Sequence, residues 1–168
     1  MLSSPYHSCL HFVKHFVHHV HFDRFVILVL VATVVTLSIV FVRPVDRLKE
    51  IHDAARATAT RDLLASMVEY QASHDDSLPS GIDDDVTTFQ LLGTETFGCE
   101  QRCSAALTVN ACLDLSSAIS ETGLRRVPVD PTSGSDFMTG YAINKLSDGR
   151  LSVVSCMSED GQKIEAGQ

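Results

Sequence analysis

The chain has 168 residues and a formal net charge of −8, with 45% hydrophobic and 20% charged residues, so its averages are those of an ordinary globular protein. The distribution is uneven, because no charge falls between Phe25 and Val42, whereas the segment from Arg43 to Gln168 holds 20 of the 21 acidic and 11 of the 13 basic residues. An acidic segment without a basic stripe excludes nucleic-acid binding by phosphate neutralisation, and the uncharged run excludes a single all-soluble domain. The composition predicts a small acidic domain attached to a membrane segment.

Residues 1–24 form a histidine-rich leader, since six of the eight histidines fall between His7 and His21. In a helix, histidines at every fourth position would share one face and could bind zinc, nickel or copper through neutral imidazole nitrogens. The candidate metal ligands at this spacing are His7, His11, His15 and His19. No H-E-x-x-H motif and no carboxylate within the cluster completes a metal site. We therefore favour an interfacial amphipathic helix whose weakly basic face contacts lipid head groups.

Residues 25–42 are predicted to form a transmembrane helix. The run from Phe25 to Val42 has 18 residues and, as a helix, would reach about 27 Å, close to the ~30 Å of a bilayer core. A cleaved signal peptide has a shorter apolar region followed by small residues, whereas this run is followed by Arg43 and Pro44. A buried core helix is also disfavoured, because the run is apolar on every face. These features favour an uncleaved anchor.

A helical extension is expected over residues 43–75, kinked or restarted at Pro44. Its first half, from Arg47 to Arg61, has few large apolar residues, so little of its surface should need burial. The stretch from Leu63 to Tyr70 has an apolar stripe at helical spacing, and only this half is expected to pack on the domain. Two isolated histidines are expected on the helix surface: His52 and His74.

Residues 76–168 are predicted to form a small globular domain with long loops. Turn formers and breakers from Asp75 to Gly81 should end the helix near His74. The three consecutive acids Asp83–Asp85 lack the alternating spacing of a calcium loop, so a solvated charge run is favoured over calcium binding. The segment Val86–Leu92 is compatible with a short helix or a strand.

The clearest strand pattern lies in the last third of the chain. Tyr141–Leu146 and Arg150–Cys156 are short runs separated by Ser147, Asp148 and Gly149, which predicts an antiparallel hairpin with the glycine at positive φ. The preceding segment, residues 127–140, contains two prolines and two glycines and is expected to be an irregular ordered loop. The predicted fold is α+β: a long N-terminal helix, membrane-spanning in its first half, packed on a small antiparallel sheet with long loops.

Four of the five cysteines lie in the domain and are the disulfide candidates: Cys99, Cys103, Cys112 and Cys156. An even number in a small domain suits disulfides in an oxidising compartment, and zinc binding is disfavoured because no histidine lies nearby. Of the three pairings, we prefer one with Cys112 bonded to Cys156, since a cysteine at a strand end can fix the sheet to the preceding loop. A bond between Cys99 and Cys103 is left open.

The membrane orientation has two conflicting indications. Basic residues follow the span, among them Arg43, Arg47 and Lys49, so the positive-inside rule would place the domain in the cytosol. The cysteines place it outside, and they receive more weight because long domains can be translocated regardless of local charge. The N-terminus, with Cys9, is then expected in the cytosol.

The domain has few of the residues and motifs that are typical of enzyme active sites. The one histidine beside it is His74, at the end of the preceding helix, and the sequence has no G-x-S-x-G, P-loop, G-x-G-x-x-G or C-x-x-C motif. We expect no enzyme activity, no catalytic residue and no cofactor.

The order of these features resembles that of type IV pilins and type II secretion pseudopilins. The stretch DAARATATRDLLASMVEYQASHDDSLP, from Asp53 to Pro79, is similar to the helix of that family with its terminal tyrosine, polar turn and proline. The segments ACLDLSS and VPVDPTSGSDFMTGYAINKLSDGRLSVVSC resemble the distal part of pseudopilins. The resemblance covers Pro44 to Cys156. The chain departs from the family pattern in its leader, because its first glycine is Gly81 and its first glutamate is Glu50, so the usual glycine processing site and fifth-position glutamate are missing.

The resemblance implies a pilin-like structural subunit, a minor or non-assembling relative that stays anchored as a single-pass protein in the bacterial inner membrane. Its expected partners are membrane lipid, other pilin-like subunits and a secretion or pilus assembly platform, without nucleic acid. The alternative function is a membrane-tethered binding module whose histidine-rich leader senses metal or pH.

Overall fold

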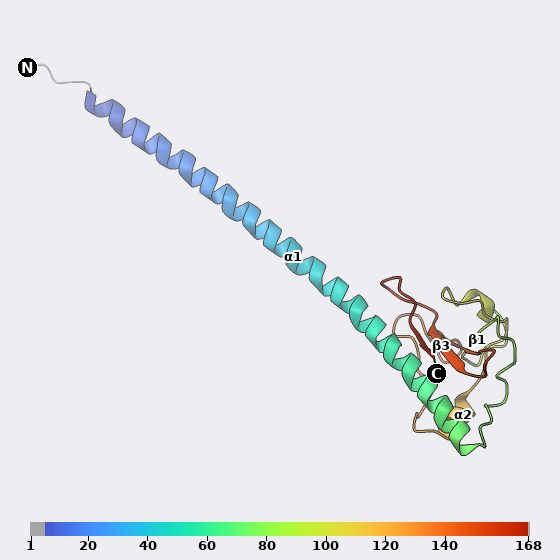
Figure 1. The fold of residues 1–168 in the computed structure, drawn as a ribbon. Helices are drawn as coiled ribbons and strands as arrows, with labels where there is room; N and C mark the ends of the chain where they lie inside the picture. The colour runs from blue at the N-terminus through green and yellow to red at the C-terminus, as the bar shows by residue number, and fades with distance from the viewer. Residues whose placement is uncertain (1–5, 168) are drawn as a thin grey trace, which may run out of the picture. The chain divides into compact units, whose positions relative to one another are not determined.

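The computed structural model describes residues 6–167, and within this range the side chains of residues 6–22 and 40–44 are not described. The helices are α1 (Tyr6–Ser73), the short 3-10 helix η1 (Cys99–Gln101) and α2 (Ser116–Ser120), and the strands are β1 (Gln90–Leu91), β2 (Tyr141–Lys145), β3 (Leu151–Ser155) and β4 (Glu165–Gly167) (Figure 1). The chain divides into two compact units, Met1–Arg47 and Leu48–Gln168. The architecture of the second unit is α+β, as predicted.

The four strands form one antiparallel sheet in the order β1-β2-β3-β4. The predicted hairpin is confirmed: β2 and β3 pair over five residues each, from Tyr141 opposite Ser155 to Lys145 opposite Leu151. Gly149 has φ 84° in the connecting turn and donates its N–H to the carbonyl of Leu146 at 2.9 Å. Because glycine has no Cβ, it adopts the left-handed conformation of this turn without steric strain.

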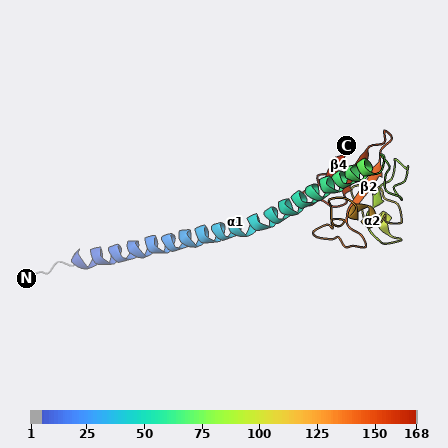
Figure 2. The same ribbon diagram turned by 90° about the horizontal axis from the view of Figure 1, so that it is seen from below.

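Both faces of the sheet are covered, which explains why every residue of β3 is buried. On one face, Leu63 and Met67 of α1 pack with Ile143 and Val153 of the hairpin. On the other face, Leu91, Ala142 and Val154 pack with the cysteine-containing loops. Figures 1 and 2 show the last turns of α1 beside the strands in both views. The sheet is the middle layer between the end of α1 and the disulfide-linked loops.

Helix α1 ends at Ser73, as the turn formers predict, and is helical through Pro44, so the expected restart at that proline is wrong. The predicted kink at Pro44 falls on residues whose side chains lie outside the described set, and it stays a prediction. The segment Val86–Leu92, for which a helix and a strand were both possible, contains the strand β1. The residues on either side of β1, Phe89 and Leu92, make isolated parallel bridges to Thr108 and Leu113.

The expectation that only Leu63–Tyr70 packs on the domain is wrong. Arg56 and Thr60 are 0% and 1% exposed, and Ala59 belongs to the core together with Leu63 and Met67. Small and polar side chains are buried here because α1 lies close to the loops, and Arg56 forms hydrogen bonds with side chains of those loops. Packing therefore begins about two turns earlier than the apolar pattern indicates.

Candidate functional site

The first candidate surface is the apolar part of α1 in unit Met1–Arg47. Every residue from Phe25 to Ile39 is exposed, and none of the 15 is charged. Leu28 and Val34, for example, are 68% and 61% exposed. The three hydroxyls in this stretch donate to main-chain carbonyls within the helix, including Thr36 Oγ1 to Ala32 O at 2.6 Å. The helix surface thus presents hydrocarbon on every side, with its polar groups already hydrogen-bonded.

In the part of the chain that the structure describes, no helix meets the combined length and hydropathy expected of a membrane span. The predicted span, Phe25 to Val42, continues into residues 40–44, whose side chains are outside the described set. The leader histidines predicted as metal ligands, His7, His11, His15 and His19, also fall on side chains that are not described. Among the described residues, no group of three or more histidine, cysteine, aspartate or glutamate side chains is placed to hold a metal.

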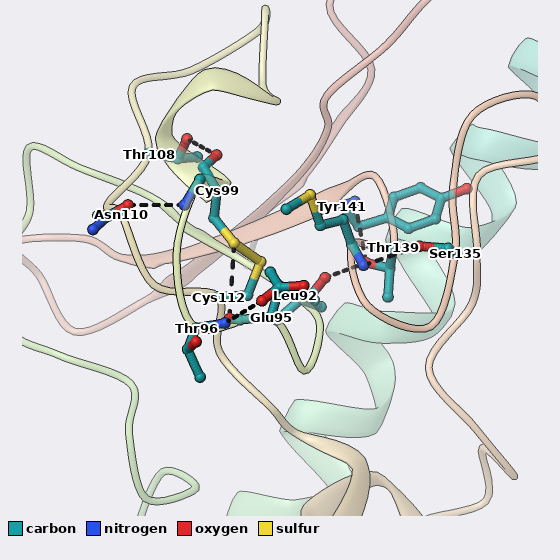
Figure 3. The surroundings of a disulfide bond; sticks show 12 residues. Leu92, Glu95, Thr96, Cys99, Thr108, Asn110, Cys112, Ser135, Thr139 and Tyr141 are labelled. Atoms are coloured by element: carbon teal, nitrogen blue, oxygen red, sulfur yellow. Dashed lines mark hydrogen bonds between the residues drawn. A yellow bond between two sulfur atoms is a disulfide. The ribbon is translucent and has the colours of Figure 1, made fainter.

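The four domain cysteines form two disulfides, but not in the preferred pairing. Cys99 bonds to Cys112 and Cys103 bonds to Cys156, so the expected bond between Cys112 and Cys156 is wrong. The physical reason is the local fold of residues 95–112, which returns the chain beside η1. Cys99 donates its N–H to Asn110 O at 3.0 Å, and Cys112 donates its N–H to Glu95 O at 3.0 Å (Figure 3).

The two disulfides fix different parts of the domain. The Cys99–Cys112 bond closes one local loop, and Thr108 Oγ1 adds a hydrogen bond to Cys99 O at 2.9 Å. The Cys103–Cys156 bond connects that loop to the residue after β3, where Ser104 N–H also donates to Cys156 O at 3.2 Å. Together they attach a loop with little regular structure to the covered sheet.

A buried arginine at the start of the packed part of α1 is the main polar feature that the sequence did not reveal. The Arg56 side chain is 0% exposed, as is that of Asp130. Arg56 Nε donates to Asp130 Oδ2 at 2.6 Å and Arg56 Nη2 donates to Asp130 Oδ1 at 3.2 Å, a bidentate pair. Arg56 Nη2 also donates to Thr132 Oγ1 at 2.7 Å. The arginine joins α1 to the loop before the hairpin.

The same arginine also reaches the loop after β3. Arg56 Nη1 donates to Asp53 Oδ1 at 2.7 Å and to Glu159 Oε1 at 3.3 Å. Asp53 in turn accepts the N–H groups of Glu159 and Asp160 at 3.0 and 3.1 Å. His52 Nδ1 lies 2.7 Å from Glu159 Oε1, so this histidine, expected to be a simple surface residue, is half-buried and within hydrogen-bond distance of an acid from a distant loop.

His74 likewise makes specific contacts. Its ring stacks on that of Tyr70 with centroids 3.9 Å apart, and its Nε2 lies 3.2 Å from Glu121 Oε2. His52 and His74 thus both pair with acids outside α1, in loops that cover the helix.

Burial opposes ionisation of Asp130, but its hydrogen bonds from Arg56, from the N–H groups of Thr132 and Ser133 and from the Thr132 hydroxyl outweigh that effect and hold its pKa well below the usual value. The same balance, with Arg56 and the N–H groups of Glu159 and Asp160 as donors, lowers the pKa of Asp53. Both carboxylates are therefore ionised around a permanently charged guanidinium. The cluster is a satisfied structural network, not an acid–base pair poised for proton transfer.

Acid should weaken the domain through this network. A carboxyl group whose pKa is depressed on folding stabilises the fold above its unfolded pKa of about 3.9, and that contribution is lost as pH falls toward the folded pKa. We expect the free energy of unfolding to fall from pH 4 toward pH 2, measured by urea denaturation of the full chain in detergent micelles. Asp130→Asn, which cannot titrate, should show a shallower decline, and an unchanged slope in that variant would contradict the assignment.

The acidic run Asp83–Asp85 is engaged within its own loop. Asp85 accepts hydrogen bonds from the Thr87 hydroxyl at 2.6 Å and from the Thr88 hydroxyl at 2.7 Å, which lower its pKa to about 2. Lys145 Nζ lies 2.6 Å from Asp84 Oδ1. The preference for a solvated charge run over calcium binding stays a prediction.

Comparison of the chain with protein-family models, with curated proteins and with solved structures gives no match. The inferences that follow depend on the residues and contacts described above.

One feature of the sequence indicates that Arg56 could be buried. It lies in a helix that is otherwise rich in alanine and threonine, where a buried arginine can reach loop carboxylates without competing with large neighbours. The partners Asp130 and Glu159 lie 74 and 103 residues away in sequence, so the pattern of α1 alone does not identify them.

Proposed function

We propose that this protein is a membrane-anchored, pilin-like structural subunit, with its apolar helix as the anchor and its disulfide-linked domain on the outer side of the membrane. The observation that supports this most directly is the uncharged helix surface from Phe25 to Ile39, in which every residue is exposed. Soluble monomers rarely expose apolar patches larger than a few hundred Å2, so this surface needs lipid or apolar helices around it.

The construction of the domain supports the same proposal. Two disulfides and a buried arginine network hold a four-stranded sheet with long loops. Disulfides of this kind persist in oxidising compartments, which favours an extracytoplasmic domain. A helix that is apolar and exposed from Phe25 to Ile39 and packed on the domain from Arg56 onward fits a pilin-like subunit, in which one helix both anchors and assembles.

The membrane anchor is tested by placing charge in the exposed apolar stretch. In Val31→Arg/Val34→Arg, each arginine should cost about 3 kcal/mol of insertion free energy at the centre of a span, and most of the protein should leave the membrane fraction. The matched control is Val31→Leu/Val34→Leu, which should remain there through carbonate extraction. Equal partitioning of the two variants, or recovery of the unmodified chain in the soluble fraction, would refute the anchor.

Assembly and topology need separate measurements. A photo-crosslinking residue at Val35, which is 52% exposed, should give crosslinks to a second copy or to other apolar helices of an assembly. Crosslinks to lipid alone would argue against a pilin-like subunit while leaving the anchor intact. Thiol labelling in cells should find the four domain cysteines protected until reductant is added, and free domain thiols facing the cytosol would overturn the proposed topology. The mass of the N-terminus then shows whether the leader is retained.

A further inference from the structure

A pocket of about 360 Å3 lies on the disulfide side of the sheet, within the unit Leu48–Gln168. Its apolar lining consists of Leu91, Met138 and Met157. Leu91 is 0% exposed, so the hydrocarbon that a ligand can contact is that of Met138, which is half-buried, and of Met157, which is 40% exposed. Flexible, polarisable methionine side chains adapt to ligands of different shape. The volume falls in the range of small-ligand pockets, about 300–1,000 Å3.

Most polar groups around this pocket already form hydrogen bonds within the protein. Ser133 donates both its N–H and its hydroxyl to Asp130, at 2.9 and 3.2 Å, and Ser135 Oγ accepts the N–H of Met138 at 3.3 Å. Gln101 Nε2 donates to Glu100 Oε1 at 3.3 Å. The nearby buried carboxylate of Asp130 is neutralised by Arg56.

Arg102 is the charged residue of the lining, and it differs from these groups. Its side chain is exposed, and among the residues whose side chains the structure describes its guanidinium has no partner in an ion pair or side-chain hydrogen bond. Its backbone N–H, by contrast, is fixed to Cys99 O at 3.3 Å, so the residue is held at the pocket by η1 and the Cys99–Cys112 disulfide. The pocket thus combines an apolar wall with one unneutralised cation in a domain that is otherwise acidic.

We propose that this pocket binds a small aliphatic carboxylate. The hydrocarbon chain lies against Met138 and Met157, and the carboxylate receives two parallel N–H hydrogen bonds from the Arg102 guanidinium, the geometry for which arginine is suited. An aliphatic ammonium of the same length places like charge beside Arg102 and is excluded. The inference does not depend on the pilin-like function, because the pocket belongs entirely to the unit Leu48–Gln168.

The test uses the methionine methyl signals of the full chain, labelled with 13C-methyl methionine in detergent micelles. The chain has four methionines, Met1, Met67, Met138 and Met157, so the spectrum is simple. Adding hexanoate should shift the signals of Met138 and Met157 in a saturable way. Met67 is 1% exposed in the core on the opposite face of the sheet, and its signal should stay in place.

Chain length and charge give the discriminating controls. Affinity should rise about fourfold per methylene from butanoate to hexanoate, the factor expected for burial of each CH2 group. Arg102→Gln should lower hexanoate affinity about tenfold or more while leaving Met67 and the fold unchanged, because the side chain is exposed. The proposal is overturned if hexanoate moves no methyl signal, if hexylammonium or hexanol moves Met138 and Met157 equally, or if Arg102→Gln binds hexanoate as the unmodified chain does.

Discussion

Arg56→Met should destabilise the domain by about 3–5 kcal/mol, the cost of leaving a buried carboxylate without its partner. Asp130 is 4% exposed and would keep only hydrogen bonds from its own loop. Methionine retains most of the apolar stem of arginine, so the loss reports the charge and hydrogen bonds more than the packing. The free energy of unfolding is measured by urea denaturation of the full chain in detergent micelles, with near-ultraviolet circular dichroism as the signal.

Two further variants separate the network from a general effect on α1. Arg61→Met changes an exposed arginine in the same helix and should stay within about 0.5 kcal/mol of the unmodified protein. Arg56→Met/Asp130→Asn removes both charges and should be less destabilised than Arg56→Met alone, since no uncompensated charge remains buried. A loss below about 1 kcal/mol in Arg56→Met would show that solvent reaches the site.

The fold could be predicted from the sequence where local patterns decide it. The hairpin follows from two apolar runs around Ser147–Gly149, and the end of α1 follows from the breakers after Ser73. Strand β4, by contrast, is a three-residue exposed edge strand, Glu165–Gly167, with no apolar alternation to mark it. It forms because β3 offers an unpaired edge, a tertiary cause that a local pattern does not contain.

The candidate sites, too, could be predicted from the sequence only in part. The apolar run and the four domain cysteines are visible as composition, but the cysteine pairing depends on how residues 95–112 fold back beside η1. The sequence predicts Arg56 within an exposed half-helix, because charged residues are seldom fully buried. Its burial depends on acids brought in by two distant loops, at Asp130 and Glu159. Contacts over such sequence separations have no signature in a single sequence.

The two disulfides should contribute unequally to stability. In the chain-entropy model, the bond between Cys99 and Cys112 closes a loop over a separation of 13 residues and the bond between Cys103 and Cys156 over 53. The model gives about 3 kcal/mol for the shorter loop and about 4 kcal/mol for the longer one. We expect Cys103→Ala/Cys156→Ala to lower the free energy of unfolding more than Cys99→Ala/Cys112→Ala, measured as for Arg56→Met.

Peptide mapping under non-reducing conditions provides the control, because the ranking holds only for this pairing. Cleavage by trypsin after Arg102 and by chymotrypsin after Leu107, which is 76% exposed, places Cys99, Cys103 and Cys112 on separate fragments. Fragments joined as Cys99 with Cys112 and Cys103 with Cys156 would confirm the two bonds. A fragment joining Cys112 to Cys156 would instead restore the pairing expected from the strand end. The backbone hydrogen bonds that hold Cys112 beside Cys99, from Cys112 N–H to Glu95 O and from Cys99 N–H to Asn110 O, would then have to break.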